Sequence, residues 1–324
     1  MPNLFPEIKP YHIEKLNVGD EQQIHIELTG NPKGIPVLFI HGGPGAGLSV
    51  NYQRFFDPER FLIIGFDQRG CGKSEPFADI SANTTEHLIE DIEHIRQYLG
   101  ISTWLMFGGS WGSSLALLVA IKYPKTIRGL ILRGIFLARQ QDTDWFLSPD
   151  GGPANLFPDS YKNFYQYAGE ELTGQAICNA YYAVFEQADE VTQARALNAW
   201  FGWEERISRL VTTESNRLRS AQNFNRIKSL ALLECHYLKH QCFIDENYIL
   251  NNVDKIAHIP ATIIHGRYDL VCKAEAAYSL HSSLPNSVLH IVPEAGHSAS
   301  EPGITGALVR ATQQFADFSI IKET

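Results

Sequence analysis

The chain has no long apolar run and few cysteines for its 324 residues. Its longest relevant apolar run, residues 115–121, is far shorter than the roughly 18 residues that a membrane-spanning helix needs. Residues 1–10 lack the apolar segment of a secretory signal. The five cysteines are odd in number and scattered, which is typical of free thiols in a reducing compartment. We therefore expect a cytoplasmic protein without a membrane partner.

Basic charge is also scarce. The sequence has 27 Lys and Arg against 36 Asp and Glu, a formal net charge of -9, and shows no basic stripe. An acidic surface disfavours nucleic acid and anionic membranes and mildly favours amine-bearing ligands. Internal repeats and low-complexity runs are not evident, and the length suits one large domain with an insertion.

A glycine-rich motif, Gly108-Gly109-Ser110-Trp111-Gly112, lies between an apolar run and a helix-like run. The pattern G-x-S-x-G at a strand-to-helix turn is the nucleophile elbow of serine hydrolases, in which the hydroxyl projects into a cleft. The alternative is an ordinary glycine-rich turn. The strand and helix patterns on either side favour the catalytic interpretation, with Ser110 as the nucleophile.

A second glycine-rich loop, HGGPG at 41–45, follows the apolar run 36–40. In the hydrolase fold, this loop and the residue after the nucleophile each supply a backbone N–H to the oxyanion hole. We therefore predict an oxyanion hole formed by Gly43 and Trp111, each donor contributing about 3–4 kcal/mol to transition-state stabilisation. A phosphate-binding P-loop is excluded, because no Lys-Ser/Thr pair follows.

Candidate partners of Ser110 follow two late strand patterns. In α/β-hydrolases the acid and then the histidine come after the serine. Asp269 follows the apolar run 261–265, and His297 follows the run 288–292. Each could alone be a surface loop residue, but their order and positions predict a triad. His297 Nε2 would take the Ser110 proton, and Asp269 would orient the imidazole.

Strand patterns alternate with helix patterns over most of the chain. Residues 11–16 and 22–28 predict an antiparallel hairpin at a sheet edge. Further strands are predicted at 37–40, 61–66, 103–107, 127–132, 261–265 and 288–292, with helices at 85–99, 113–122, 274–284 and 305–318. This alternation predicts an α/β-hydrolase fold on a mostly parallel, doubly wound sheet.

The alternation stops between about residues 137 and 259. This stretch is rich in aromatic residues and helix formers and lacks convincing strands. We predict a helical cap over the carboxyl ends of the strands, where it would exclude water and shape the specificity pocket. The predicted catalytic core is therefore residues 1–137 and 260–324, and the predicted cap is residues 138–259.

Four potential zinc ligands lie close together in this stretch: Cys235, His236, His240 and Cys242. On one helix they occupy neighbouring faces, and all four converge on a metal only if the helix breaks. We interpret them as ordinary helix residues, with a zinc site as the alternative. We expect neither a metal nor an organic cofactor.

Taken together, the motifs resemble those of the proline iminopeptidases, serine α/β-hydrolases that release N-terminal proline from peptides. The resemblance runs over essentially the whole chain, and its motifs in the cap are much more specific than those in the core. The motifs are HGGPG (41–45), DQRGCGKS (67–74), GGSWGS (108–113), LRGIF (132–136), AWFGWE (199–204), ECHY (234–237), GRYD (266–269) and GHS (296–298).

The resemblance implies that Glu204 and Glu234 bind the free amine of the substrate. Carboxylates in a closed pocket can pair with a protonated amine, whereas an acylated amine leaves them unpaired at a cost of about 3–5 kcal/mol. The resemblance also maps the pocket for the pyrrolidine ring onto Phe136 and Phe146. Family members often carry Tyr at the second position, and core packing is the alternative for both phenylalanines.

The predicted function is release of N-terminal proline from peptides through a prolyl-enzyme ester. The alternatives are a broader serine aminopeptidase or an esterase of the same fold, and a non-catalytic binding protein on this scaffold. Ser110 excludes the chemistry of epoxide hydrolases and dehalogenases, which need Asp at the elbow. Nucleic acid is not an expected partner, and formation of a homo-oligomer is left open.

Overall fold

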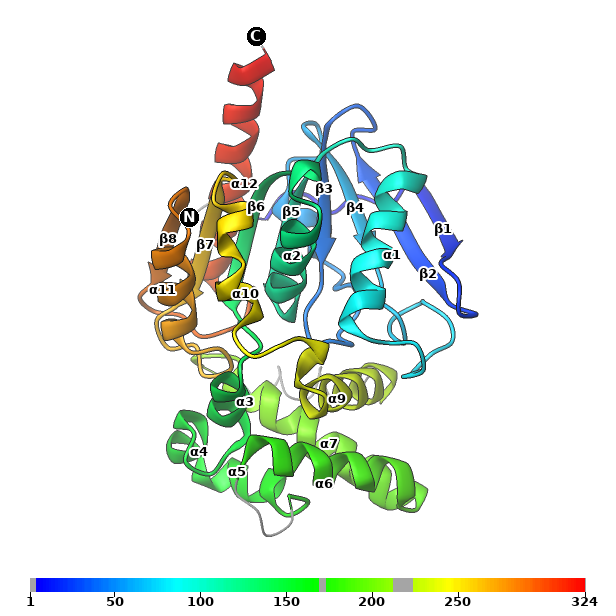
Figure 1. Ribbon diagram of the computed structural model, residues 1–324, viewed down its shortest axis with the longest axis vertical. Helices are drawn as coiled ribbons and strands as arrows, with labels where there is room; N and C mark the ends of the chain where they lie inside the picture. Colours follow the sequence, from blue (N-terminus) through cyan, green and yellow to red (C-terminus); the bar gives the residue numbers. More distant parts are fainter. Residues whose placement is uncertain (1–3, 169–172, 212–223, 324) are drawn as a thin grey trace.

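Eight strands form one sheet in the order β1-β2-β4-β3-β5-β6-β7-β8 (Figure 1). The computed structural model describes residues 4–168, 173–211 and 224–323, with side chains up to residue 318. Strands β1 and β4 pair antiparallel with β2, and all other neighbours are parallel, which confirms the predicted α/β-hydrolase fold. The strands are β1 (His12–Asn17), β2 (Gln23–Gly30), β3 (Ile35–Ile40), β4 (Phe61–Phe66), β5 (Trp104–Ser110), β6 (Ile127–Ile135), β7 (Ala261–Gly266) and β8 (Ser287–Val292).

Successive side chains of the central strands pack into two separate cores. Leu38 and Met106 belong to the core that includes α1, α2 and α11. Val37 and Leu105 belong to the core that includes α12 and the 3-10 helix η1. Both faces of the parallel strands are thus covered, as their nearly continuous apolar sequences require. The elements are η1 (Tyr52–Phe55), α1 (Thr85–Tyr98), α2 (Trp111–Lys122), α11 (Ala274–Ser283) and α12 (Pro302–Glu323).

The structure extends two central strands beyond their predicted ends. Strand β5 continues to Ser110 and β6 to Ile135, and α2 begins at Trp111, directly after β5. The apolar patterns end earlier because glycines and Arg133 interrupt them. The extension pairs Gly109 with Arg133 and Ser110 with Ile135, so the end of β6 lies beside the elbow.

Helices α3 to α7 and α9, which lie between β6 and β7 in the chain, gather at one end of the sheet, where they form a layer of their own (Figure 1). Stacked and edge-to-face rings of Phe164, Tyr181, Trp200 and Trp203 form the interior of this layer. Aromatic pairs contribute about 0.5–1.5 kcal/mol each beyond the area they bury. The helices are α3 (Gln140–Leu147), α4 (Gly152–Leu156), α5 (Pro158–Tyr165), α6 (Gly174–Gln187), α7 (Glu190–Ile207) and α9 (Phe224–Lys239).

Two short helices at the end of the predicted cap range contact the core. Helix α10 (Tyr248–Asn251) and the 3-10 helix η4 (Val253–Ile256) both pack against α2. We therefore propose that the cap ends before α10 and that residues 248–259 continue the layer of helices on the sheet.

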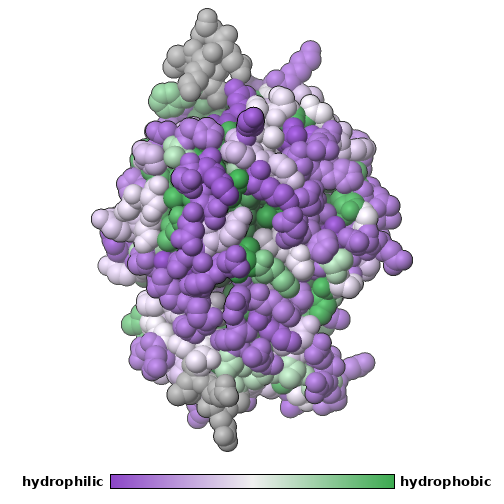
Figure 2. Space-filling model, in the orientation of Figure 1, coloured by the Kyte–Doolittle hydropathy of each residue, from purple (hydrophilic) through white to green (hydrophobic). Residues whose placement is uncertain are grey.

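The surface visible in Figure 2 is mostly hydrophilic, with apolar side chains in small separate patches. Over the part of the chain that the structure describes, every helix is too short or too polar to cross a membrane.

Candidate active site

Ser110 lies in the tight turn between β5 and α2. Its backbone has φ 59° and ψ -130°, a conformation that residues with a side chain rarely adopt. A Cβ on Gly112 would lie 2.2 Å from the carbonyl oxygen of Ile40, and a Cβ on Gly108 would lie 2.1 Å from that of Gly112. Close packing therefore requires both glycines of the motif, and the turn presents Ser110 at the start of α2.

Asp269, in the loop after β7, is buried and contacts His297. Its Oδ2 lies 2.7 Å from His297 Nδ1, and its Oδ1 accepts the backbone N–H groups of Val271 and Cys272 at 3.0 and 2.8 Å. Burial alone would raise the pKa of Asp269, but His297, His265 and the backbone N–H of Cys272 together more than offset it, so this pKa lies below its usual range. Asp269 is therefore a carboxylate at neutral pH and can orient the imidazole.

Arg133, near the end of β6, contacts the other ring nitrogen of His297. Its Nη1 lies 3.0 Å from His297 Nε2 and 2.9 Å from the His297 carbonyl oxygen. Since a guanidinium can only donate, Nε2 carries the lone pair and the ring proton is on Nδ1. This is the tautomer of a general base, although Arg133 occupies the place at Nε2 that we expected for the Ser110 hydroxyl. Burial lowers the pKa of His297, and the charge of Arg133 lowers it further, whereas Asp269 raises it by a smaller amount.

The loop after β3 lies beside the elbow. Gly42, Gly43 and Ser110 line the same cavity, and Trp111 is the buried first residue of α2. The N–H of Trp111 is at the positive end of the helix dipole. The role of the Gly43 and Trp111 N–H groups as oxyanion donors stays a prediction.

Two glutamates of neighbouring cap helices lie near this loop and elbow. Glu204 on α7 lines the cavity, while Glu234 on α9 is buried and accepts a 2.6 Å hydrogen bond from Trp200 Nε1. Burial, with repulsion from Glu205, raises the pKa of Glu204 to about 7. Burial, with repulsion from Glu204, raises the pKa of Glu234 well above its usual range. A bound cation would offset the cost of charging this pair.

One cavity of about 350 Å³ brings four of the nine predicted site residues together, whereas Asp269, Trp111 and Glu234 lie outside its lining. Side chains from the core and the cap line it, so a ligand in it would contact both. Its lining includes Gly43, Ser110, Arg133, Glu204 and His297.

The two phenylalanines proposed for the pyrrolidine pocket lie outside this lining. Phe136 follows β6 and is partly buried, and Phe146 on α3 is buried in the apolar core. The Phe146 carbonyl accepts a 3.0 Å hydrogen bond from Trp203 Nε1. Their role toward substrate thus stays a prediction.

Sequence reasoning overlooked Arg133 as a site residue. Arg133 is the second residue of the LRGIF motif at 132–136. A charged residue within an apolar strand is the signal that could have identified it. Its contact with His297 spans 164 residues, which no local pattern reveals.

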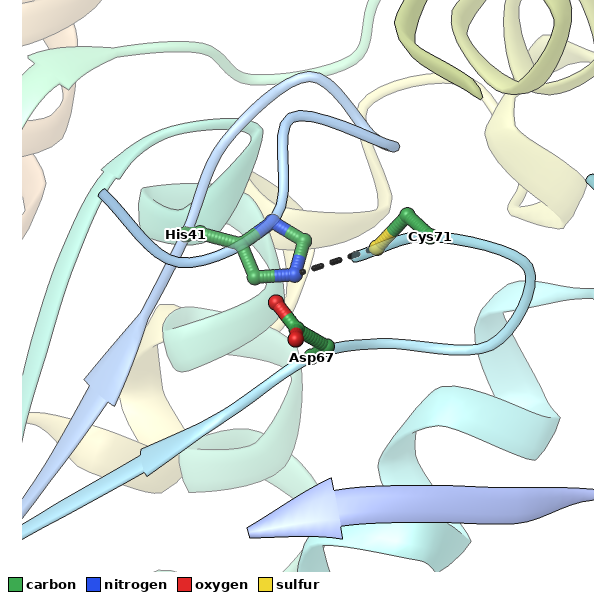
Figure 3. Close-up of side chains that lie close together, drawn as sticks. All are labelled: His41, Asp67 and Cys71. Carbon is green, nitrogen blue, oxygen red and sulfur yellow. Dashed lines mark hydrogen bonds between the residues drawn. The ribbon is translucent and has the colours of Figure 1, made fainter. Parts of the chain in front are cut away.

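Within the described ranges, one group has donor types and spacing suited to a metal ion: His41, Asp67 and Cys71, whose ligand atoms lie within 4.8 Å of one another (Figure 3).

In the segment considered as a zinc site in the sequence, residues 235–242, two of the four candidate ligands bond to separate backbone carbonyls instead. Cys235 Sγ donates to Cys178 O at 3.4 Å, and His236 Nε2 lies 3.1 Å from Asn83 O.

Comparison with known proteins gives the same fold and, within that fold, one family of relatives. The model of the alpha/beta hydrolase fold family matches residues 35–303. A probable proline iminopeptidase of Leptolyngbya boryana is 42% identical over 316 residues, 97% of each chain. The proline iminopeptidase of Arabidopsis thaliana is 42% identical over 312 residues, 96% of this chain and 81% of the relative.

Solved structures at lower identity show the fold alone. The proline iminopeptidase of Mycobacterium smegmatis is 17% identical with a TM-score of 0.61, covering 95% of this chain and 100% of its own. An esterase of Exiguobacterium antarcticum is 20% identical with a TM-score of 0.62, covering 94% and 96%. Structural likeness thus does not separate peptidase from esterase, whereas the sequence relatives do. The chain belongs to the proline iminopeptidase family of α/β-hydrolases.

Proposed function

We propose that this protein is a serine exopeptidase that releases N-terminal proline from peptides. One observation carries the proposal: Ser110, His297 and the cap carboxylate Glu204 line one cavity. A nucleophile and a base suit acyl transfer, and a carboxylate in the same cavity suits a cationic chain end. The five cysteines are buried and form no disulfide, which supports a location in a reducing compartment such as the cytoplasm.

In the proposed reaction, Ser110 attacks the carbonyl of the N-terminal residue and His297 Nε2 takes the hydroxyl proton. The Arg133 guanidinium must first leave Nε2, because that lone pair has room for one donor. The N–H groups of Gly43 and Trp111 stabilise the oxyanion. His297 then protonates the departing amine, and water activated by the same ring hydrolyses the ester.

The cap carboxylates restrict this reaction to a free chain end. A protonated proline nitrogen between Glu204 and Glu234 neutralises charge that burial otherwise disfavours. An internal peptide bond offers no such cation. The 2.6 Å hydrogen bond from Trp200 holds Glu234 in place before substrate arrives.

Two measurements test the proposal. A fluorophosphonate should label the wild-type protein at Ser110 and leave Ser110→Ala unlabelled, which separates an enzyme from a binding protein. A panel of Pro, Ala and Leu p-nitroanilides and short p-nitrophenyl esters should then show the highest kcat/KM for Pro. Faster turnover of Leu anilide or of the esters would favour a broader aminopeptidase or an esterase.

A further inference from the structure

A buried glutamine connects the two segments proposed to form the oxyanion hole. The Gln68 side chain donates from Nε2 to the His41 carbonyl at 2.8 Å and accepts at Oε1 the indole N–H of Trp111 at 3.1 Å. Its backbone N–H donates to His41 Nε2 at 3.0 Å. All three residues are at most 3% exposed. Gln68 thus joins the residue that begins the HGGPG loop to the residue after Ser110.

The tautomer of His41 extends this connection along the loop. Because Nε2 accepts the Gln68 N–H, the ring proton lies on Nδ1, which faces the Gly42 carbonyl at 3.0 Å. The backbone before Gly43 is therefore held at the carbonyls of His41 and Gly42. Gln68 contacts the first carbonyl directly, and it also fixes the His41 ring that contacts the second.

A metal ion is the competing explanation for the cluster of His41, Asp67 and Cys71 (Figure 3), in which His41 and Cys71 contact Gln68. The lone pair of His41 Nε2 already accepts the Gln68 N–H. Asp67 accepts the backbone N–H groups of Leu48 and Lys73 at 2.7 and 2.9 Å. The Cys71 thiol lies 3.2 Å from the Gln68 carbonyl, and burial raises the pKa of this thiol well above its usual range. Each of these side chains is thus already hydrogen-bonded within the protein, and we interpret the cluster as a hydrogen-bonded support.

We propose that Gln68 is a positioning residue that sets the spacing between the oxyanion donors Gly43 and Trp111. The proposal rests on the function proposed above. Gln68 lies outside the cavity lining and acts through the two backbone segments that it joins. Its loss therefore affects the transition state, in which the oxygen is charged, more than the bound substrate, which the cap carboxylates hold.

The test compares three single variants and one double variant, all of which keep the proposed catalytic groups. Gln68→Met keeps the length and removes both side-chain bonds, and Trp111→Phe removes the indole N–H but keeps the backbone N–H. Gln22→Met is the control, because Gln22 is as buried at 1% exposed and its amide donates to Asp79 at 2.7 Å, a residue outside the elbow and the HGGPG loop. Circular dichroism and thermal melting select folded protein.

We expect Gln68→Met to lower kcat on prolyl-p-nitroanilide about 10- to 100-fold, since a misplacement of about 1 Å can cost 10²-fold, with KM within about twofold. Trp111→Phe should lower kcat less, and the double variant should fall short of the product of the two losses. Gln22→Met should keep kcat. Unchanged kcat in folded Gln68→Met, a rise in KM alone, or an equal loss in Gln22→Met would overturn the proposal.

A second readout separates this proposal from the proposed function. The rate at which a fluorophosphonate labels Ser110 depends on the oxyanion donors and needs no proline, so it should fall in Gln68→Met in parallel with kcat. If the wild type fails to cleave the prolyl substrate, the proposed function is wrong, and the labelling rates still decide the role of Gln68. Equal labelling rates in the wild type and Gln68→Met would show that the hole does not depend on Gln68.

Discussion

Glu204 changes its charge near neutral pH. Its pKa is raised to about 7, so the carboxyl group is mostly neutral below that pH and charged above it. A neutral carboxyl group cannot pair with an ammonium, and kcat/KM reports the free enzyme. We therefore expect kcat/KM for prolyl-p-nitroanilide to fall as the pH drops through about 7.

In the Glu204→Gln variant, this step near pH 7 should disappear. At higher pH, kcat/KM should lie below the wild-type value by about 1.5–3 kcal/mol, roughly 10- to 150-fold, the usual contribution of a hydrogen bond to a charged group. Stopped assays between pH 5 and 9 measure both effects. An unchanged pH profile in this variant would remove Glu204 from the amine site.

Arg133 places a positive charge against the ring of His297, which lowers the pKa of that ring in addition to burial. Removing the charge in Arg133→Met should raise the His297 pKa, so the fall of kcat on the acid side should move to higher pH. The kcat–pH profile and an NMR titration of the imidazole measure this shift. Arg60→Met, which removes an arginine paired with Asp317 at 2.9 Å, is the control and should leave the profile unchanged.

Helix α9 of the cap contacts the HGGPG loop, which we propose to supply an oxyanion donor. Ser229 Oγ on this helix donates to the Gly45 carbonyl at 2.9 Å and is buried. Ser229→Ala should lower the free energy of unfolding by about 0.5–1.5 kcal/mol and reduce kcat a few-fold, because the loop loses its bond to the cap. Urea unfolding and steady-state assays check both values.

Ser283→Ala is the control, because the exposed Ser283 hydroxyl on α11 donates to the preceding Ser279 carbonyl at 3.0 Å, within its own helix. This control should change neither kcat nor stability by a measurable amount. If both serine variants behave alike, the bond between α9 and the loop does not support the site.

The elements that the sequence predicted well are those with strong local patterns. The central strands show apolar runs, and the elbow around Ser110 shows glycines at positions where close packing leaves no room for a side chain. The contacts of Arg133 and Gln68 were not predictable, since each joins residues far apart in the chain. The continuation of β6 to Ile135 was missed because pairing with β5 outweighs its mixed local composition.

For the molecule as a whole, core and cap each supply part of the proposed site. Ser110 and His297 come from the core and Glu204 from the cap, and they meet only where the two layers face one cavity. Motifs identified both the core residues and the cap residue, but the distance between them depends on how the cap packs on the sheet. The sequence could therefore name the groups without giving the cavity between them.

All five cysteines are free and buried in the fold. Burial raises the pKa of Cys272, beside the proposed catalytic acid, well above its usual range, so this thiol is protonated at neutral pH. Ellman's reagent should therefore react slowly with the native protein and rapidly with five thiols in denaturant. Reducing agent should leave the melting temperature unchanged. Rapid labelling of native protein with loss of activity would show that a thiol is accessible at the site.

The proposed grip of the cap on a cationic chain end can be measured with one pair of substrates. We predict that the wild type cleaves prolyl-p-nitroanilide and that N-acetylprolyl-p-nitroanilide, which lacks the ammonium, reacts at least about 100-fold more slowly in kcat/KM, equivalent to about 3 kcal/mol. Equal kcat/KM for the two substrates would contradict the account, because Glu204 and Glu234 would then have no part in selecting the substrate.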